Sequence, residues 1–337
     1  MTTLVTGAAG FIGYHVARHL LKAGEQVVGI DNFNSYYNPS LKRARALDLR
    51  ETGGSRFTCH EVDFADEGAL DAALAAVAFD RIVHLGAQAG VRYSIDNPRA
   101  YISANLAGHL NMLEIARARR PSHFVYASSS SVYGGNDVTP FRISDRVERP
   151  VSLYAATKRA DELLSETYAH LFRLPMTGLR FFTVYGPWGR PDMAMWVFTR
   201  KILAGEPIPV FNHGRMRRDF TYIDDIVNGV IAALERPPSD DGQAKAGGSL
   251  SPHAIYNLGN SCSHPLRHMI ALLEQACGRE AKLELLPPQP GEVLDTFADI
   301  SESRAELGFD PKTTLEAGVP RFVDWFKEHF KIDRGAA

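Results

Sequence analysis

Cysteine is scarce in this sequence. Its three cysteines, Cys59, Cys262 and Cys277, are spread over a chain of 337 residues. Thiols this few and this far apart form neither a disulfide framework nor the paired ligands of a zinc site. We therefore expect no metal site and a reducing compartment, the cytoplasm.

Long apolar runs and excess charge are missing as well. No segment is apolar over the length that a bilayer requires, and the first residues lack the basic, apolar and small-residue sections of a signal peptide. The formal net charge of −2 argues against a dedicated nucleic-acid binder. With 45% hydrophobic residues, the chain can still bury a large core. The sequence thus predicts a protein that binds neither a membrane nor a nucleic acid.

What the sequence does contain is a regular alternation of short apolar strands and helical segments. The predicted strands lie at residues 4–6, 26–30, 56–62, 80–85, 123–127 and 176–181, and long helices are expected at 14–22, 100–119 and from residue 153. This order is typical of a parallel sheet with helices on both faces. We therefore predict an α/β fold with a Rossmann-type doubly wound parallel sheet.

Three glycines follow the first predicted strand, and an acidic residue ends the second. Gly7, Gly10 and Gly13 precede a helical segment, and Asp31 stands eighteen residues after Gly13. Such glycines let the backbone approach a pyrophosphate at a helix N-terminus, and the carboxylate accepts hydrogen bonds from a ribose. The spacing departs by one residue from the usual dinucleotide fingerprint, so the glycines alone would also suit an ordinary turn. Asp31 favours the cofactor interpretation, and NAD over NADP, because it repels a 2′-phosphate.

The strand and helix alternation ends near residue 183, where proline and glycine become frequent. A helix predicted at residues 224–236 and a strand at 254–258 return to the main sheet. We expect residues 1–182, with 224–260 returning to them, to form the NAD-binding Rossmann domain. Residues 183–330 are expected to form most of a smaller α/β substrate-binding lobe.

Tyr154 and Lys158 lie four residues apart, so they share one face of a predicted helix. An ammonium beside a phenol stabilises the phenolate and makes the tyrosine a base, although the same spacing also arises by chance on many helices. Serines at residues 128–131 end the fifth predicted strand, where ligands of parallel sheets bind. Together with the glycine turn, these residues favour a hydride-transfer site.

These segments together resemble the extended short-chain dehydrogenases/reductases of the nucleotide-sugar epimerase group, and within it the UDP-glucuronate 4-epimerases. The resemblance covers essentially the whole chain and rests on residues 7–13, 31–37, 128–135, 152–158, 180–193 and 218–224. Residues 7–13 and 152–158 are shared by the whole superfamily. Residues 31–37 and 180–193 resemble segments of a much smaller group of these enzymes. The assignment to the subgroup therefore rests on them.

The resemblance implies an enzyme that inverts C4 of a UDP-hexuronate through a 4-keto intermediate and tightly bound NAD. Tyr154 would take the proton of the C4 hydroxyl, Lys158 would hold the nicotinamide ribose, and Ser129 would hydrogen-bond the reacting oxygen. The residues implied to bind NAD are Gly7, Gly10, Phe11, Ile12, Gly13, Asp31, Asn32, Asp63, Phe64, Leu85, Ala87, Gln88, Asn105, Tyr154, Lys158 and Phe181.

A second set of residues is expected to bind the substrate, and the resemblance implies that one of them, Arg218, would clamp the UDP diphosphate. They are Arg92, Ser130, Ser131, Thr183, Arg190, Met193, Arg218 and Glu292. Sugar dehydratases of this fold carry Asp-Glu where this chain has Ser130 and Ser131, which argues against dehydration. The hydroxyls of Ser130, Ser131 and Thr183 suit a carboxylate, which favours a uronate over galactose.

Several alternatives stay open at this stage. Arg190 could instead stabilise its loop, and Arg218 belongs to a basic cluster that could be a solvated turn. Galactose-type relatives carry Arg where this chain has Gln289, which leaves the nucleotide contacts there undecided. A UDP-galactose 4-epimerase, a UDP-glucuronate decarboxylase and a non-catalytic NAD-binding sensor are the competing functions. By resemblance, we also expect a homodimer formed by helices 100–119 and 153–172.

Overall fold

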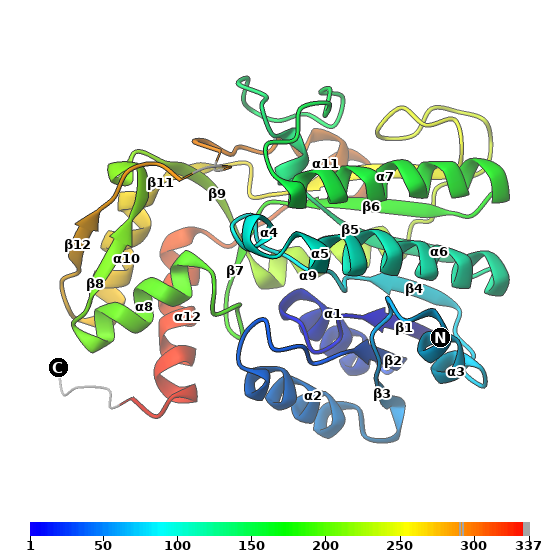
Figure 1. The fold of residues 1–337 in the computed structure, drawn as a ribbon, viewed down its shortest axis with the longest axis horizontal. Coiled ribbons are helices and arrows are strands. Elements are labelled where there is room, and N and C mark those ends of the chain that lie inside the picture. The colour runs from blue at the N-terminus through cyan, green and yellow to red at the C-terminus, as the bar shows by residue number, and fades with distance from the viewer. Residues whose placement is uncertain (290, 292, 333–337) are drawn as a thin grey trace.

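A seven-stranded parallel sheet forms the larger part of the molecule. The computed structural model describes residues 1–289, 291 and 293–332. The strands are β1 (Thr2–Thr6), β2 (Gln26–Asp31), β3 (Phe57–Glu61), β4 (Arg81–His84), β5 (His123–Ser129), β6 (Met176–Phe181) and β10 (His253–Leu258). Their order is β10-β6-β5-β4-β1-β2-β3. Successive strands are added on one side of β1 up to β3 and on its other side from β4 onward, so the strand order reverses between β1 and β4. This topology confirms the predicted doubly wound sheet (Figure 1).

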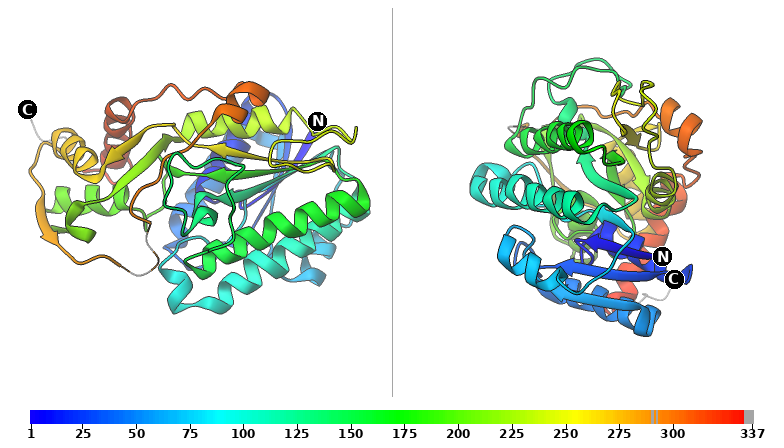
Figure 2. Two further views of the ribbon diagram at one scale, coloured as in Figure 1. Left: turned by 90° about the horizontal axis from the view of Figure 1, so that it is seen from above. Right: turned by 90° about the vertical axis from the view of Figure 1, so that its right-hand side faces the viewer.

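Helices cover both faces of this sheet (Figure 2). On one face α1 (Phe11–Lys22) packs against α2 (Pro39–Gly53) and α9 (Ile223–Leu234), and on the other α6 (Gly108–Arg119) packs against α3 (Glu67–Leu74) and α7 (Leu153–Phe172). Every residue of β4, β6 and β10 is buried. Because both faces are covered, these strands show no alternation of buried and exposed residues, and even polar side chains such as Arg180 are buried in them.

The helix predicted over residues 100–119 is present, but it contains a π-helical segment that the sequence pattern did not indicate. The chain passes through α4 (Tyr93–Asp96), α5 (Pro98–Tyr101) and a π-helical segment, η2 (Ile102–Ala107), before α6 begins. Within η2 the side chain of Asn105 is buried. It accepts a hydrogen bond from the Gln88 amide and donates to the Gln88 carbonyl and to Thr157 Oγ1. The wider π turn thus ties this helix to the loop after β4 and to α7.

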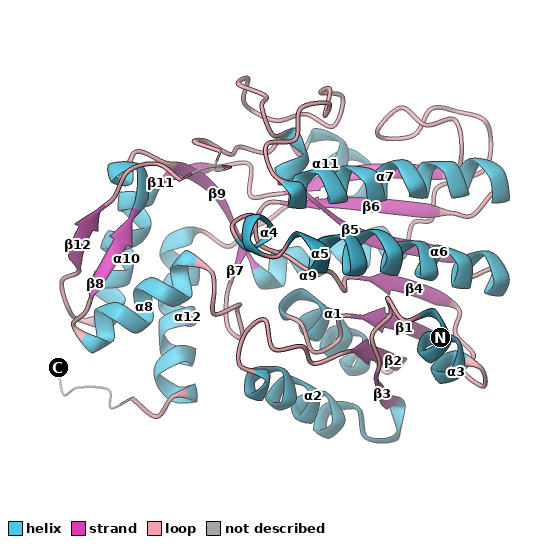
Figure 3. Cartoon of the chain, in the orientation of Figure 1, coloured by secondary structure: helices cyan, strands magenta, loops and turns pink. Residues whose placement is uncertain are grey.

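A smaller lobe, seen at the left of Figure 3, contains two short sheets. One consists of β7 (Thr183–Tyr185), β9 (Arg217–Tyr222) and β11 (Ser263–Pro265), and the other of β8 (Pro207–Val210) and β12 (Lys282–Leu285). The helices α8 (Ala194–Ala204), α10 (Leu266–Cys277) and α12 (Leu315–His329) pack with them, while α11 (Ser301–Leu307) packs on β10 and α9. None of the helices described is long and apolar enough to cross a membrane.

Candidate active site

A cavity of about 330 Å³ opens at the carboxyl ends of β1, β4, β5 and β6. This is the edge where the strand order changes direction, the usual ligand site of an open parallel sheet. Most of the predicted site residues line it: Gly7, Gly10, Phe11, Ile12, Gly13, Asp31, Asn32, Phe64, Leu85, Ala87, Gln88, Ser129, Ser130, Ser131, Tyr154, Lys158, Phe181, Thr183, Arg190 and Met193.

The glycine turn between β1 and α1 forms a wall of bare backbone. A Cβ on Gly13 would stand 2.1 Å from the Gly7 carbonyl oxygen, and one on Gly7, where φ is +67°, would stand 2.8 Å from the Gly86 nitrogen. Side chains are therefore excluded here, which leaves the N-terminus of α1 open to the cavity. A bare helix N-terminus favours an anion, so the turn fits the pyrophosphate of a dinucleotide.

Asp31 lies beside the glycine turn and is held by the backbone. Its carboxylate accepts hydrogen bonds from the Ala9 amide at 3.1 Å and from the Phe33 amide at 2.9 Å. Lys42 Nζ lies 3.9 Å from Asp31 Oδ1, and both side chains are buried. This carboxylate is fixed at the place where a dinucleotide presents its adenosine ribose.

Tyr154 and Lys158 enter the cavity from the first turns of α7. Ser152 begins this helix by accepting a hydrogen bond from the Ala155 amide through its side chain. Lys158 Nζ donates to the Ala127 carbonyl at 3.0 Å and to Asp161 Oδ2 at 2.9 Å. The Tyr154 ring packs edge-on against Tyr101. The helix thus presents a phenol and a fixed ammonium to one ligand, as the spacing predicts.

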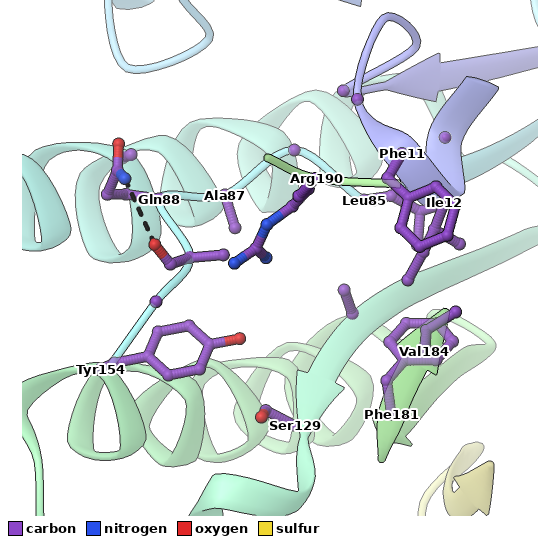
Figure 4. Close-up of a pocket in the computed structure, with 18 of the residues that line it drawn as sticks. Phe11, Ile12, Leu85, Ala87, Gln88, Ser129, Tyr154, Phe181, Val184 and Arg190 are labelled. Carbon is purple, nitrogen blue, oxygen red and sulfur yellow. Dashed lines mark hydrogen bonds between the residues drawn. The ribbon is translucent and has the colours of Figure 1, made fainter. Parts of the chain in front are cut away.

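A group of hydroxyls faces Tyr154 across the cavity. Ser129 Oγ donates to Ser131 Oγ at 3.1 Å and accepts a hydrogen bond from the Ser131 amide at 3.2 Å. Ser130 and Thr183 line the same space. In Figure 4 the hydroxyls of Tyr154 and Ser129 point toward the same open region. This arrangement supplies a base and several hydrogen-bond donors around one small volume.

Arg190 is both held by its own loop and exposed to the cavity. Its guanidinium makes two hydrogen bonds to Asp192, at 3.0 and 2.7 Å, and the Tyr36 hydroxyl donates to the same carboxylate at 3.0 Å. Burial opposes the charge of Asp192, but Arg190 outweighs it and lowers the pKa of that carboxyl. Figure 4 shows the guanidinium directed toward the region in front of Tyr154. The two interpretations of Arg190, loop stabiliser and ligand contact, are therefore compatible.

Four predicted site residues that the structure describes do not line the cavity. Asn105 is buried behind the Gln88 loop, and Asp63 accepts hydrogen bonds from Asn32 Nδ2 and the Ala65 amide. The Arg92 guanidinium lies over the Phe211 ring at 4.4 Å. Arg218, on β9, donates to the carbonyl oxygens of Arg217 and Leu294. Glu292 lies outside the described residues.

Sequence reasoning also missed residues that line the cavity. Among them are Asn34, Tyr36, Tyr37 and Lys42, which follow β2. The sequence signal was available, because the polar and aromatic segment at residues 31–37 comes directly after the strand that ends in Asp31. Only the tertiary contact of Tyr36 with Asp192 shows that this segment reaches the far wall of the cavity.

Comparisons with known proteins agree with this geometry. Residues 3–259 match the model of the NAD dependent epimerase/dehydratase family. The chain is 46% identical to UDP-glucuronate 4-epimerase 4 of Arabidopsis thaliana, covering 100% of this chain and 78% of the relative. It is 45% identical to the probable UDP-glucuronate 4-epimerase of Rhizobium meliloti, covering 98% of both.

A solved structure of similar fold is the UDP-glucuronic acid 4-epimerase from Bacillus cereus in complex with UDP-glucuronic acid and NAD. It superposes with a TM-score of 0.85 at 33% identity and covers 98% of this chain and 100% of that one. The UDP-glucose 4-epimerase of Thermus thermophilus in complex with NAD gives a TM-score of 0.83 at 27% identity, with both chains fully covered. With its parallel sheet, bare glycine turn and Tyr154–Lys158 helix, the chain belongs to the NAD-dependent epimerase/dehydratase family.

Proposed function

We propose that this chain catalyses the reversible C4 epimerisation of UDP-glucuronate to UDP-galacturonate with bound NAD. The observation that carries the proposal is that Tyr154 shares one cavity with the hydroxyls of Ser129, Ser130, Ser131 and Thr183. A base beside a row of neutral donors suits a sugar that carries both a reacting hydroxyl and a carboxylate. The names of the relatives support the same sugar.

The two parts of the molecule would divide the work. Residues 1–182 with 224–260 would hold NAD, because their sheet contributes the glycine turn, Asp31 and the wall formed by Leu85 and Ala87. Residues 183–330 would bind most of the UDP-sugar. Thr183, Arg190 and Met193, which begin this lobe, already line the cavity.

The residues at the start of α7 and at the end of β5 would handle the proton. Bound NAD supplies an acceptor and then a donor for the hydrogen at C4. Tyr154, as phenolate, takes the proton of the C4 hydroxyl and returns it after the 4-keto sugar has turned in the cavity. Lys158 stabilises the phenolate through its positive charge, and Ser129 donates a hydrogen bond to the reacting oxygen.

The remaining hydroxyls would protect the carboxylate. Oxidation of a glucuronate at C4 creates a β-keto acid, which loses CO₂ when its carboxylate aligns with the carbonyl π system. Ser130, Ser131 and Thr183 can donate to the carboxylate and hold it out of that alignment, while Arg190 adds a positive charge to the lining of the same cavity. A decarboxylase would require the opposite orientation in a similar cavity.

Three predicted ligand contacts stay predictions. Arg92 and Arg218 lie beyond the cavity lining, and Glu292 lies outside the described residues. We retain Arg218 as the proposed diphosphate contact, since it lies on β9 in the smaller lobe and guanidinium groups bind phosphates with two hydrogen bonds. A cytoplasmic location likewise stays a prediction from the sequence.

NMR of the products formed from UDP-glucuronate tests the function directly. We expect UDP-galacturonate to accumulate to equilibrium, with no added cofactor required if NAD remains bound. A UDP-pentose would identify a decarboxylase, and turnover of UDP-galactose alone would identify the galactose-type enzyme. Absence of turnover with every UDP-sugar would contradict catalysis and support the NAD-binding sensor.

The proposed assembly is a homodimer formed by α6 and α7. These helices pack side by side and expose apolar side chains: Leu110 is 41%, Leu163 53% and Leu171 62% exposed. Large apolar side chains that stay exposed together on one face favour a partner surface. Light scattering should give twice the chain mass, and Leu163→Glu should give a monomer. A monomeric wild-type protein would contradict this assembly.

A further inference from the structure

Asp161 is a buried carboxylate directly behind the proposed catalytic pair. It lies one turn after Lys158 on α7, and its relative exposure is 0%. Its Oδ2 atom accepts a hydrogen bond from Lys158 Nζ at 2.9 Å. Asp161 does not line the cavity, and the chemistry derived so far does not use it.

The hydrogen bonds of Lys158 fix where its charge lies. An ammonium carries three N–H donors. One reaches the Ala127 carbonyl on β5, and one reaches Asp161. The third is left for the cavity, which Lys158 lines. Asp161 and β5 together therefore hold the ammonium in one orientation beside the position of Tyr154.

The ionisable groups around this pair are either neutral or bound in ion pairs. Burial lowers the pKa of His109 on α6 to about 3 and lowers that of His84 on β4 well below its usual range, so both are neutral near pH 7. Glu162 pairs with Arg180 on β6 and with Arg159.

Tyr126 on β5 completes these surroundings. Burial raises the pKa of the Tyr126 hydroxyl well above the ordinary value of a phenol, so this side chain also stays neutral. Arg190, which pairs with Asp192, is another charge that acts on Tyr154. Asp161 is the carboxylate bonded to Lys158, and its charge acts through Lys158 on Tyr154.

Ionising the Asp161 carboxyl in this buried position costs free energy. Burial raises the pKa of Asp161 to about 6 even though Lys158 favours the charged form. Among the described residues, no group donates a hydrogen bond to its other oxygen, Oδ1. An asparagine would keep the hydrogen bond from Lys158 without this cost. Packing and hydrogen bonding alone therefore do not explain why an ionisable residue, rather than asparagine, stands at position 161.

We propose that Asp161 is a positioning residue that holds the Lys158 ammonium and offsets part of its field at the Tyr154 phenol. A reversible epimerase needs a tyrosine that accepts a proton in one half of the reaction and returns it in the other. Without a nearby negative charge, the Lys158 ammonium would make the Tyr154 phenolate too weak a base to accept the proton. When Asp161 offsets part of that positive charge, Tyr154 can both accept the proton and return it. The inference rests on the proposed function, because it assumes that Tyr154 is the acid and base.

Asp161→Asn tests the proposal, since it removes the charge and keeps an acceptor for Lys158. Because the negative charge stabilises the neutral phenol, its loss should move the acid limb of the kcat profile to lower pH by about 0.5 to 1 unit, with KM changed less than about twofold. Glu166→Gln is the matched control, because it removes another carboxylate of α7 whose partners are His253 and Ser249. Its acid limb should coincide with that of the wild type.

A second readout does not depend on turnover. The ultraviolet absorbance of tyrosinate, taken as the difference between each protein and its Tyr154→Phe form, follows the ionisation of Tyr154 without substrate. This titration should also move to lower pH in Asp161→Asn, even if the sugar substrate has been assigned wrongly. Should Asp161→Asn fail to fold, Asp161→Ser carries the same expectation. An acid limb and a tyrosinate titration that stay in place, or move to higher pH, would overturn the proposal.

Discussion

Tyr154 provides the sharpest test at the scale of single residues. Tyr154→Phe removes the hydroxyl and keeps the ring that packs against Tyr101. Turnover of UDP-glucuronate should fall at least about 100-fold, the lower range for loss of a general acid and base. Product NMR measures the rate, and the absorbance of extracted cofactor measures bound NAD. Retained NAD is expected, and loss of NAD or of the fold would show that Tyr154 is structural.

The hydroxyls that face the proposed carboxylate give a second prediction. Ser131→Ala or Thr183→Ala removes one donor worth about 1 kcal/mol, so KM for UDP-glucuronate should rise roughly fivefold, or release of CO₂ should increase. Kinetics with product NMR and CO₂ detection separate these effects. Ser239→Ala, in the exposed loop between α9 and β10, is the control. Unchanged kinetics in both cavity variants would rule out the proposed carboxylate pocket.

Residues close together in sequence were predictable, and residues joined by the fold were not. The glycine turn and the Tyr154–Lys158 pair follow local spacings that a strand, turn and helix impose. Asp161 and the bridge from Tyr36 to Asp192 depend on burial or on contacts across more than 150 positions of the chain. For the same reason, the sequence could not show that Arg92 and Asp63 lie outside the cavity lining, and their predicted contacts with substrate and NAD stay predictions.

At the scale of elements, α7 is anchored by a buried ion pair. Glu162 accepts two hydrogen bonds from Arg180 on β6, at 2.8 and 2.9 Å, and both side chains are almost fully buried. Burial opposes ionisation of Glu162, but Arg180 outweighs it and keeps the pKa of the carboxyl below its usual value. Because the folded-state pKa is depressed, this stabilisation exists above the ordinary pKa of glutamate and is lost as the pH falls.

Glu162→Gln should therefore destabilise the protein strongly. It leaves the Arg180 charge buried without its partner, which costs about 3–5 kcal/mol of the free energy of unfolding. Chemical denaturation at pH 7 measures the change. Glu61→Gln, in the exposed pair with Arg43, is the control and should have no measurable effect. Equal stability of Glu162→Gln and the wild type would contradict the anchoring role.

The π-helical segment at residues 102–107 is a detail of the predicted helix that the sequence did not indicate. Helical periodicity continues through this segment, so the sequence pattern predicts one regular helix. The fold instead adopts a π turn that buries Asn105 and lets it bond both polar groups of the Gln88 backbone. Tertiary hydrogen bonds decided the local geometry here. Asn105 accordingly supports the cavity from behind rather than lining it.

At the scale of the whole molecule, several buried histidines make the fold sensitive to acid. Burial lowers the pKa of His15 and His123 to about 4, of His109 to about 3, and of His84 well below its usual range. Each stays neutral when folded but binds a proton when unfolded. Stability is therefore lost as the pH falls below about 6.5, by roughly 2 kcal/mol per histidine at pH 5.

Two buried carboxyls act in the opposite direction. The pKa of Asp161 and of Asp219 is raised to about 6 by burial, so their protonation stabilises the folded state as the pH falls. The four histidines outnumber them, and Tm should drop between pH 7 and pH 5. Calorimetry at constant ionic strength measures this shift. A Tm that stays level or rises between pH 7 and pH 5 would contradict the conclusion that the four histidines outweigh the two carboxyls.

The sheet was predictable as a whole, whereas the smaller lobe was predicted only in outline. The strands of the large sheet are recognisable in the sequence as short, largely apolar runs that alternate with helical segments. The short strands β7, β9 and β11 have no such signal, and they pair between segments far apart in the chain.

The pairing of β10 with β6 has a consequence for how the protein is made. All six residues of β6 are buried, and β10 pairs with each of them in register. During synthesis β6 leaves the ribosome more than seventy residues before its partner strand at residues 253–258, so an apolar edge stays unpaired over that interval. A gene fragment that ends at residue 182 should aggregate, whereas one that restores this last strand should remain dispersed.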